Sequence, residues 1–316
     1  MILGGPTGAG KTDIALALSE RIPCEIVSMD SRQVYLGMDV GTAKPSRAVR
    51  CAVRHHLIDV ASPDHTFSAA EFADRAEEAI AGIRGRERLP LLVGGSGLYI
   101  QATVDGLFDG PAANPIVRNR LRAEAASRGS EALHQRLRAV DAEAARGIHP
   151  RDTVRVIRAL EVYEISGHPV STLRQQKREV RSNVVFYGVR WPRPELYRRI
   201  NRRVDEMIEQ GLVNEVRRLV AQGYTDELPS FQAVGYRQLV RYLQGAYHLN
   251  EAIRLIKRDT RRLAKRQLNW FRRDGRVIWW DLEQYDSVQA VADAMANDVR
   301  RRFPDVARLR TQKRVR

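Results

Sequence analysis

Strand-like runs alternate with amphipathic stretches over the first hundred residues. The strand candidates are 1–3, 25–28, 57–60 and 89–93, and the last is a continuous apolar run that ends in Gly94-Gly95. Short runs of this kind, bounded by turn-forming residues, are typical of buried strands. Apolar residues recur at helical spacing over 13–21 and 69–84. The alternation predicts an α/β fold in which a parallel sheet is covered by helices on both faces.

The pattern changes near residue 105. Residues 105–115 are rich in Gly, Pro, Asn and Asp, and 116–166 are helical in character without a strand-like run. Strand character returns at 184–189, helical patterns follow at 195–221, 235–244 and 250–272, and 277–280 resembles a last strand. We therefore expect an α/β core made of 1–105 and 184–303, with an all-helical insertion domain at 106–183. The basic tail, 304–316, is expected to be disordered.

Positive charge is concentrated in the second part of the chain. The net charge is +15; residues 1–100 carry 11 Lys and Arg against 12 Asp and Glu, whereas 101–316 carry 42 against 26. This asymmetry favours a polyanionic partner such as nucleic acid, with a solubilising use of arginine as the alternative. Cys24 and Cys51 are the only cysteines, which excludes a cysteine-based zinc site. Without a signal peptide or a run of membrane-spanning length, we expect a cytoplasmic protein that contacts no membrane.

A phosphate-binding loop follows the first strand candidate. The sequence Gly5-Pro6-Thr7-Gly8-Ala9-Gly10-Lys11-Thr12 matches the pattern GxxxxGK[ST] and precedes a helical stretch. The amides of such a P-loop, together with the N-terminus of the next helix, bind phosphate oxygens. Lys11 is expected to reach the terminal phosphate, and the Thr12 hydroxyl to bind Mg²⁺. The motif indicates a phosphorylated ligand without identifying it.

Two further strand candidates are followed by polar residues suited to a ligand crevice. Asp30 comes just after the run 25–28, and the carboxyl ends of strands face the crevice in such sheets. An aspartate there serves as a general base or metal ligand, or simply caps a turn. Ser96 follows the run 89–93 within Gly-Gly-Ser-Gly. No acidic residue ends that run where an ATPase commonly binds its magnesium, which weakens the interpretation as an NTP hydrolase.

Basic residues in the second part offer candidate phosphate contacts. Arg203 borders the apolar stripe of its helix, so it either turns inward to bind a diphosphate or remains a solvated surface arginine. The segment 254–276 is dense in Lys and Arg, and helical spacing places several on one face: Arg258, Arg261, Arg262, Lys265 and Arg266. The preceding segment 232–237 offers Gly235 for close approach and Tyr236 for stacking on a base.

Taken together, these motifs resemble the tRNA dimethylallyltransferases, also called tRNA isopentenyltransferases, of bacterial type. The matching strings are GPTGAGKT (5–12), DSRQVY (30–35), GMDVGTAKP (37–45), GGSGLY (94–99), RALEV (158–162), VGYR (234–237) and TRRLAKRQ (260–267). The P-loop is shared with many unrelated proteins. The strings at 37–45 and 260–267 are much more specific, and they occur in the family's order and spacing.

The resemblance implies an enzyme that transfers the dimethylallyl group of dimethylallyl diphosphate to N6 of adenosine 37 in tRNA and releases diphosphate. It implies Asp30 as the base that accepts the N6 proton, and Ser96 as a hydroxyl beside the target nucleotide. Lys11, Arg203, Mg²⁺ and the P-loop amides would stabilise the departing diphosphate, with Thr12 as the metal ligand. The implied partners are tRNA and dimethylallyl diphosphate, and the chain is expected to act as a monomer.

The resemblance also implies a set of tRNA contacts, with the helical insertion clamping the anticodon stem-loop. Carried over by position, the contacts fall on Asp30, Ser31, Arg32, Gln33, Ser96, Arg118, Val154, Arg155, Val156, Ile157, Arg158, Gln232, Ala233, Val234, Gly235, Tyr236, Arg237, Thr260, Arg261, Arg262, Lys265, Arg266 and Gln267.

Three other functions remain as alternatives. A P-loop kinase for a small molecule would consume ATP and have no affinity for tRNA. A GTPase-like RNA-binding module would need the guanine-reading string Asn-Lys-x-Asp, which the chain lacks. An adenylate isopentenyltransferase would act on the free nucleotide, and would need neither the helical insertion nor the basic segment 254–276.

Overall fold

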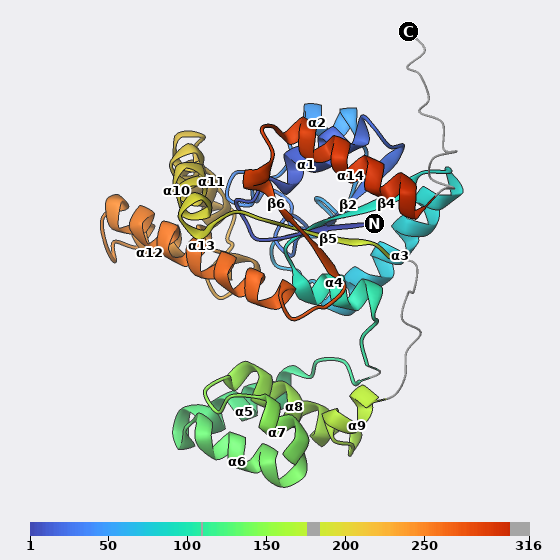
Figure 1. Ribbon diagram of the computed structural model, residues 1–316. Helices are drawn as coiled ribbons and strands as arrows, with labels where there is room; N and C mark the ends of the chain where they lie inside the picture. The colour runs from blue at the N-terminus through green and yellow to red at the C-terminus, as the bar shows by residue number, and fades with distance from the viewer. Residues whose placement is uncertain (109, 176–183, 304–316) are drawn as a thin grey trace. The chain divides into compact units, whose positions relative to one another are not determined.

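The computed structural model describes residues 1–108, 110–175 and 184–303 (Figure 1). Contacts divide the chain into two compact units, Met1–Val104 with Arg181–Arg316, and Asp105–Val180. The predicted basic tail at 304–316 and the predicted end of the insertion at 176–183 lie outside the described residues. Within the described ranges, no helix combines the length and apolar character needed to cross a membrane.

The first unit is built on a parallel sheet of six strands in the order β3-β2-β4-β1-β5-β6. The strands are β1 (Ile2–Gly4), β2 (Cys24–Met29), β3 (His55–His56), β4 (Leu89–Gly94), β5 (Phe186–Arg190) and β6 (Val277–Asp281). Register places Leu3 between Val93 of β4 and Tyr187 of β5. The predicted parallel sheet is confirmed, and β1 with its P-loop lies in its interior.

Helices cover both faces of the sheet, as predicted. Because side chains alternate along a strand, Leu3 and Tyr187 belong to one apolar core, whereas Ile2 and Phe186 belong to the other. The first core is closed by α1 (Lys11–Ser19) and α14 (Val288–Arg302). The second is closed by α3 (Ala69–Gly85), α4 (Gly97–Val104), α10 (Arg193–Glu209), α11 (Leu212–Ala221), α12 (Tyr236–Leu243) and α13 (Leu249–Phe271). Short helical segments occur at α2 (Arg47–Ala52), η1 (Ser230–Gln232) and η2 (Leu282–Gln284).

Two expectations about single elements were wrong. The strand predicted at 57–60 is instead the two-residue β3, because Leu57 and Asp59 have φ values of 63° and 58° that an extended strand cannot continue. The helix predicted at 195–221 is two helices, α10 and α11. Gly211, with φ of 92°, interrupts it in the left-handed conformation that glycine adopts readily.

The second unit is a small helical bundle. It contains α5 (Pro115–Arg128), α6 (Ser130–Val140), α7 (Ala142–Gly147), α8 (Thr153–Ser166) and α9 (Val170–Gln175), and its described residues include no strand. Asn114 caps α5 by accepting from the amides of Ile116 and Val117. Leu121, Leu137 and Leu160 lie in an apolar core that belongs to this unit alone.

Candidate active site

A cavity of about 420 Å³ opens at the carboxyl ends of β1, β2 and β4, within the first unit. Its walls are the P-loop, the turn after β2, the loop Val40–Pro45, Gly94-Gly95 at the end of β4, and one side of α10. Gly94 is required where two strand ends meet, since a Cβ there would lie 2.2 Å from the Met29 carbonyl oxygen. Segments far apart in sequence therefore converge on one pocket.

The P-loop connects β1 to α1 with glycines in conformations that other residues rarely adopt. Gly8 and Gly10 have φ values of 81° and 89°, and Gly10 is the N-cap of α1 without a side-chain cap. The amides of the first helical turn are thus left for an anion. The Lys11 ammonium donates to the carbonyl oxygens of Gly5 at 2.9 Å and Pro6 at 2.8 Å. The loop has the geometry expected of a phosphate-binding site.

Three side chains outside the motif hold the loop in shape. Gln267 of α13 accepts from the Thr7 amide at 2.8 Å and donates to the Gly95 carbonyl at 3.1 Å. Arg199 donates to the Gly8 carbonyl at 3.1 Å, and Trp191 donates to the Ala9 carbonyl at 3.2 Å. The Arg199 guanidinium lies 4.9 Å above the Trp191 ring. Sequence reasoning missed Arg199 and Trp191, and it assigned Gln267 to tRNA, whereas its amide here joins two loops of the protein.

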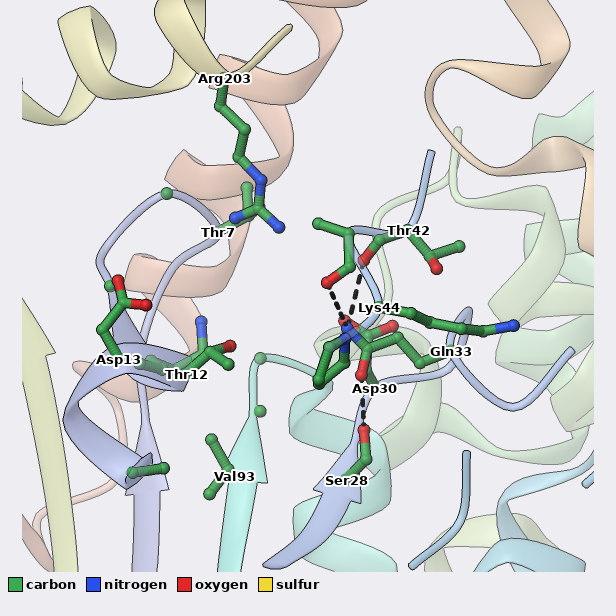
Figure 2. A pocket seen from close by; sticks show the side chains of 18 of the residues that line it. Thr7, Thr12, Asp13, Ser28, Asp30, Gln33, Thr42, Lys44, Val93 and Arg203 are labelled. Atoms are coloured by element: carbon green, nitrogen blue, oxygen red, sulfur yellow. Dashed lines mark hydrogen bonds between the residues drawn. The ribbon is translucent and has the colours of Figure 1, made fainter. Parts of the chain in front are cut away.

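Two cations face the cavity beside this loop. Burial lowers the pKa of Lys11 to about 8; the negative charge of Asp30 opposes this shift, and Arg203 adds to it. Burial also lowers the pKa of Arg203, against the influence of Asp30. The Arg203 guanidinium extends from α10 toward Thr7 (Figure 2) and has no hydrogen bond or ion pair with another described residue. The arginine predicted from the helical pattern therefore faces inward.

Asp30 lies directly after β2 and lines the same cavity. One carboxylate oxygen accepts from the Arg32 amide at 2.8 Å, so Asp30 does shape the turn. Its other oxygen has no hydrogen-bond partner among the residues described. The Ser96 hydroxyl accepts from the Ser31 amide at 3.0 Å and fixes this turn from the β4 side. Gln33 accepts from Ser28 at 3.0 Å and donates to the Thr42 and Ala43 carbonyls, which holds the next wall in place.

Part of the predicted RNA-contacting set points inward. Tyr236 is fully buried and donates its hydroxyl to Glu215, so the prediction that it stacks on a base is wrong: its ring faces the core. Ala233, Val156 and Ile157 are also buried in apolar cores, so their side chains do not reach a ligand either.

The remaining predicted cations divide into paired and unpaired groups. Arg237, Arg258 and Arg262 surround one carboxylate, Asp259, and leave two positive charges in excess. Arg261 donates to Asn201 at 2.7 Å. Lys265 and Arg266 are exposed on α13 and form no ion pair with any described residue. In the helical unit, Arg118 and Arg158 both bind the buried Glu161, whereas Arg155 is exposed and lies 3.4 Å from Asp152. The neighbouring Val154 is exposed as well.

The residues that line the cavity suit a magnesium ion that is bound mainly through the phosphates of a substrate. The described residues contain no cluster of three His, Cys, Asp or Glu that could hold a metal. Mg²⁺ commonly keeps several waters and uses one or two protein ligands plus substrate phosphates. The Thr12 side chain is exposed in the cavity at the start of α1, next to the loop amides, and therefore fits that role.

Comparisons with known proteins identify close similarities along the chain. The sequence model of the family described as IPP transferase matches residues 33–274. The chain is 47% identical to tRNA dimethylallyltransferase 2 of Geotalea uraniireducens over 281 residues, which is 88% of this chain and 91% of that one. It is 44% identical over 307 residues to the tRNA dimethylallyltransferase of Alkaliphilus oremlandii, covering 96% and 97%. The full-length tRNA isopentenylpyrophosphate transferase of Bacillus halodurans superposes with a TM-score of 0.72 at 41% identity, covering 98% and 97%.

Proposed function

The chain belongs to the IPP transferase family, and we propose that it transfers the dimethylallyl group of dimethylallyl diphosphate to N6 of adenosine 37 in tRNA. One observation carries the chemistry: the P-loop, Lys11 and Arg203 line the same cavity as the carboxylate of Asp30. That arrangement pairs an anion-binding wall with a proton acceptor. The kinase alternative is set aside, because relatives over most of the chain are tRNA dimethylallyltransferases.

The P-loop holds the diphosphate of the donor. Its amides and the N-terminus of α1 bind the phosphate oxygens, and the Lys11 ammonium leaves the Gly5 and Pro6 carbonyls to bind them too. Arg203 adds a forked guanidinium from α10, beside the loop. These groups stabilise the negative charge that grows on the diphosphate as it departs. Mg²⁺ at the Thr12 hydroxyl would supply further charge neutralisation there.

Asp30 accepts the proton that the nucleophile loses. The adenine N6 lone pair is delocalised into the ring, so N6 attacks weakly unless its proton is removed as the bond forms. The bond between N6 and the allylic carbon forms, and the bond from that carbon to the diphosphate oxygen breaks with its electron pair leaving on diphosphate. The N6 proton moves to the Asp30 oxygen that has no described partner. Atoms and charge balance without an oxidant or reductant.

The acceptor is bound through its backbone and through a base turned out of its stack. In the first unit, exposed Lys265 and Arg266 and the positive excess around Asp259 offer contacts for phosphates. In the helical unit, exposed Arg155 does the same, and we assign this unit to the anticodon stem-loop. Arg118 and Arg158 instead hold the unit together through Glu161.

A transfer assay with purified protein tests the proposal against its competitors. Labelled dimethylallyl diphosphate is offered with tRNA, with AMP, or with a tRNA that carries guanosine at position 37. Label is expected only in the tRNA with adenosine at that position. Label in AMP would indicate the adenylate enzyme, and ATP consumption without transfer would indicate the kinase.

The affinity for pyrophosphate is expected to fall above pH 8. Lys11 has a free-protein pKa of about 8 instead of its ordinary 10.5, so it is charged below pH 8 and neutral above it. The neutral amine loses its attraction for the anion. Because the ligand titrates as well, the measured quantity is the ratio of wild-type to Lys11→Met affinity at each pH. We expect a constant ratio below pH 7 that declines from pH 8; a constant ratio up to pH 10 would contradict it.

Removal of the two unpaired cations on α13 is expected to weaken tRNA binding. In the double variant Lys265→Ala, Arg266→Ala, the slope of log affinity against log salt should shrink by about one per side chain. Arg254→Ala is the matched control, because this exposed arginine of the same helix is bound to Glu251 through both of its carboxylate oxygens. Filter binding over a salt series measures the slopes. Equal slopes for the double variant and wild type would place the tRNA elsewhere.

A further inference from the structure

Glu215 is a buried carboxylate without a cationic partner among the described residues. It lies on α11 with 4% of its surface exposed. One oxygen accepts from the amides of Asp39 at 2.9 Å and Val40 at 2.8 Å. The other accepts from the Gly41 amide at 3.1 Å and the Tyr236 hydroxyl at 2.6 Å. Four donors offset the cost of burying this charge, and three of them belong to consecutive residues of one loop.

That loop forms a wall of the cavity. Val40 and the residues from Thr42 to Pro45 line the cavity directly. Gln33 holds the far side of the loop through the Thr42 and Ala43 carbonyls. Gly41 packs closely against the Tyr236 ring, and a Cβ at this position would lie 2.5 Å from a ring carbon. The position of the wall is therefore set from behind by Glu215 and Tyr236.

Tyr236 also belongs to the segment 232–237, in which Gln232 is exposed at the surface. It is the first residue of α12, and the next residue, Arg237, reaches Asp259 in the basic cluster. Burial and the neighbouring Glu215 raise the pKa of Tyr236 well above its ordinary value, so its hydroxyl stays protonated and donates. A continuous chain of contacts thus runs from the basic surface of α12 and α13 to the cavity wall.

We propose that Glu215 and Tyr236 are positioning residues that couple RNA binding at 232–237 to the diphosphate pocket. RNA that binds this segment restricts the position of the N-terminus of α12, and therefore of the Tyr236 hydroxyl. Because this hydroxyl donates to Glu215, the Glu215 carboxylate is held in place as well. The carboxylate in turn fixes the loop through the amides of Asp39, Val40 and Gly41. The loop Val40–Pro45 then keeps a single conformation where it faces the bound diphosphate. RNA and diphosphate therefore bind with positive cooperativity. This inference rests on the proposed function, because it requires both ligands to bind this unit.

The variant Tyr236→Phe tests the coupling with little change of shape. The dissociation constant of inorganic pyrophosphate is measured by calorimetry with the full chain, with and without an anticodon stem-loop RNA. The ratio of the two constants is the RNA effect, which we expect to be about tenfold in wild type. It should fall to near one in Tyr236→Phe, whatever the affinity of that variant for pyrophosphate alone. Glu215→Gln, which turns an amide NH₂ toward N–H donors, should abolish the RNA effect as well.

Tyr247→Phe is the matched control. Tyr247 donates its hydroxyl to the Gln238 carbonyl at 2.8 Å, so this variant also loses one hydroxyl hydrogen bond near α12 but leaves the loop untouched. We expect it to keep the full RNA effect. An undiminished RNA effect in Tyr236→Phe, or no RNA effect in wild type, would overturn the inference. If wild type nevertheless transfers the dimethylallyl group, the proposed function stands; absence of transfer would remove the proposed function itself.

Discussion

Replacement of Asp30 by asparagine is expected to lower kcat by roughly 10²–10⁴-fold, the usual contribution of a positioned general base. The amide cannot accept the N6 proton, yet its oxygen still accepts from the Arg32 amide and keeps the turn after β2. The affinity for tRNA should therefore change little. Single-turnover transfer and filter binding measure the two quantities separately.

Glu206→Gln is the control for Asp30→Asn. Glu206 also lines the cavity, but it is exposed on α10 and lies 3.5 Å from Arg202. Removing this negative charge is expected to leave kcat within about threefold, because exposed ion pairs contribute little. Full turnover by Asp30→Asn, or an equal loss in both variants, would remove Asp30 as the base.

Replacement of Lys11 by methionine is expected to reduce kcat/KM for dimethylallyl diphosphate by about 10²–10³-fold, the loss typical when one stabilising donor to a developing anion is removed. The ammonium donates to two carbonyls of the P-loop and faces the cavity, where it can reach a bound anion. The KM for tRNA should be unchanged. Steady-state kinetics with each substrate varied in turn measures the difference.

Lys265→Met serves as the reverse control. It removes the same charge from an exposed position on α13, outside the lining of the cavity. The expected effect is a higher KM for tRNA with unchanged donor kinetics at saturating tRNA. A Lys11 variant that binds and uses the donor normally would contradict the assignment of the P-loop to the diphosphate.

Much of the core could be predicted from sequence because its signals are local. The P-loop motif, the apolar run of β4 and the period of α13 each lie within one short segment. The stripe Val291, Met295 and Val299 of α14 carries the same kind of signal, although no helix was predicted there. The strand predicted at 57–60 was wrong because apolar residues occupy a turn there. The left-handed backbone of this turn cannot be recognised from the hydrophobic pattern.

The parts of the site that sequence did not predict depend on contacts between distant segments. Glu215 binds backbone amides 174 to 176 positions away, and an amide has no residue-specific signature. Arg199 and Trp191 likewise act on carbonyls of the P-loop. For Tyr236, the motif match identified the residue but did not indicate whether its ring faces the protein core or the solvent. The structure shows that the ring is buried, so Tyr236 supports the cavity wall instead of stacking on a base.

Mass spectrometry of tRNA treated with the purified protein tests whether adenosine 37 is the acceptor of the dimethylallyl group. An unmodified tRNA with adenosine at position 37 is incubated with dimethylallyl diphosphate and Mg²⁺, digested, and its fragments are sequenced by mass. We expect one dimethylallyl group on N6 of adenosine 37 after treatment with wild type, and none after treatment with Asp30→Asn. With wild type, an unmodified adenosine 37, or a modification elsewhere in the tRNA, would contradict this expectation.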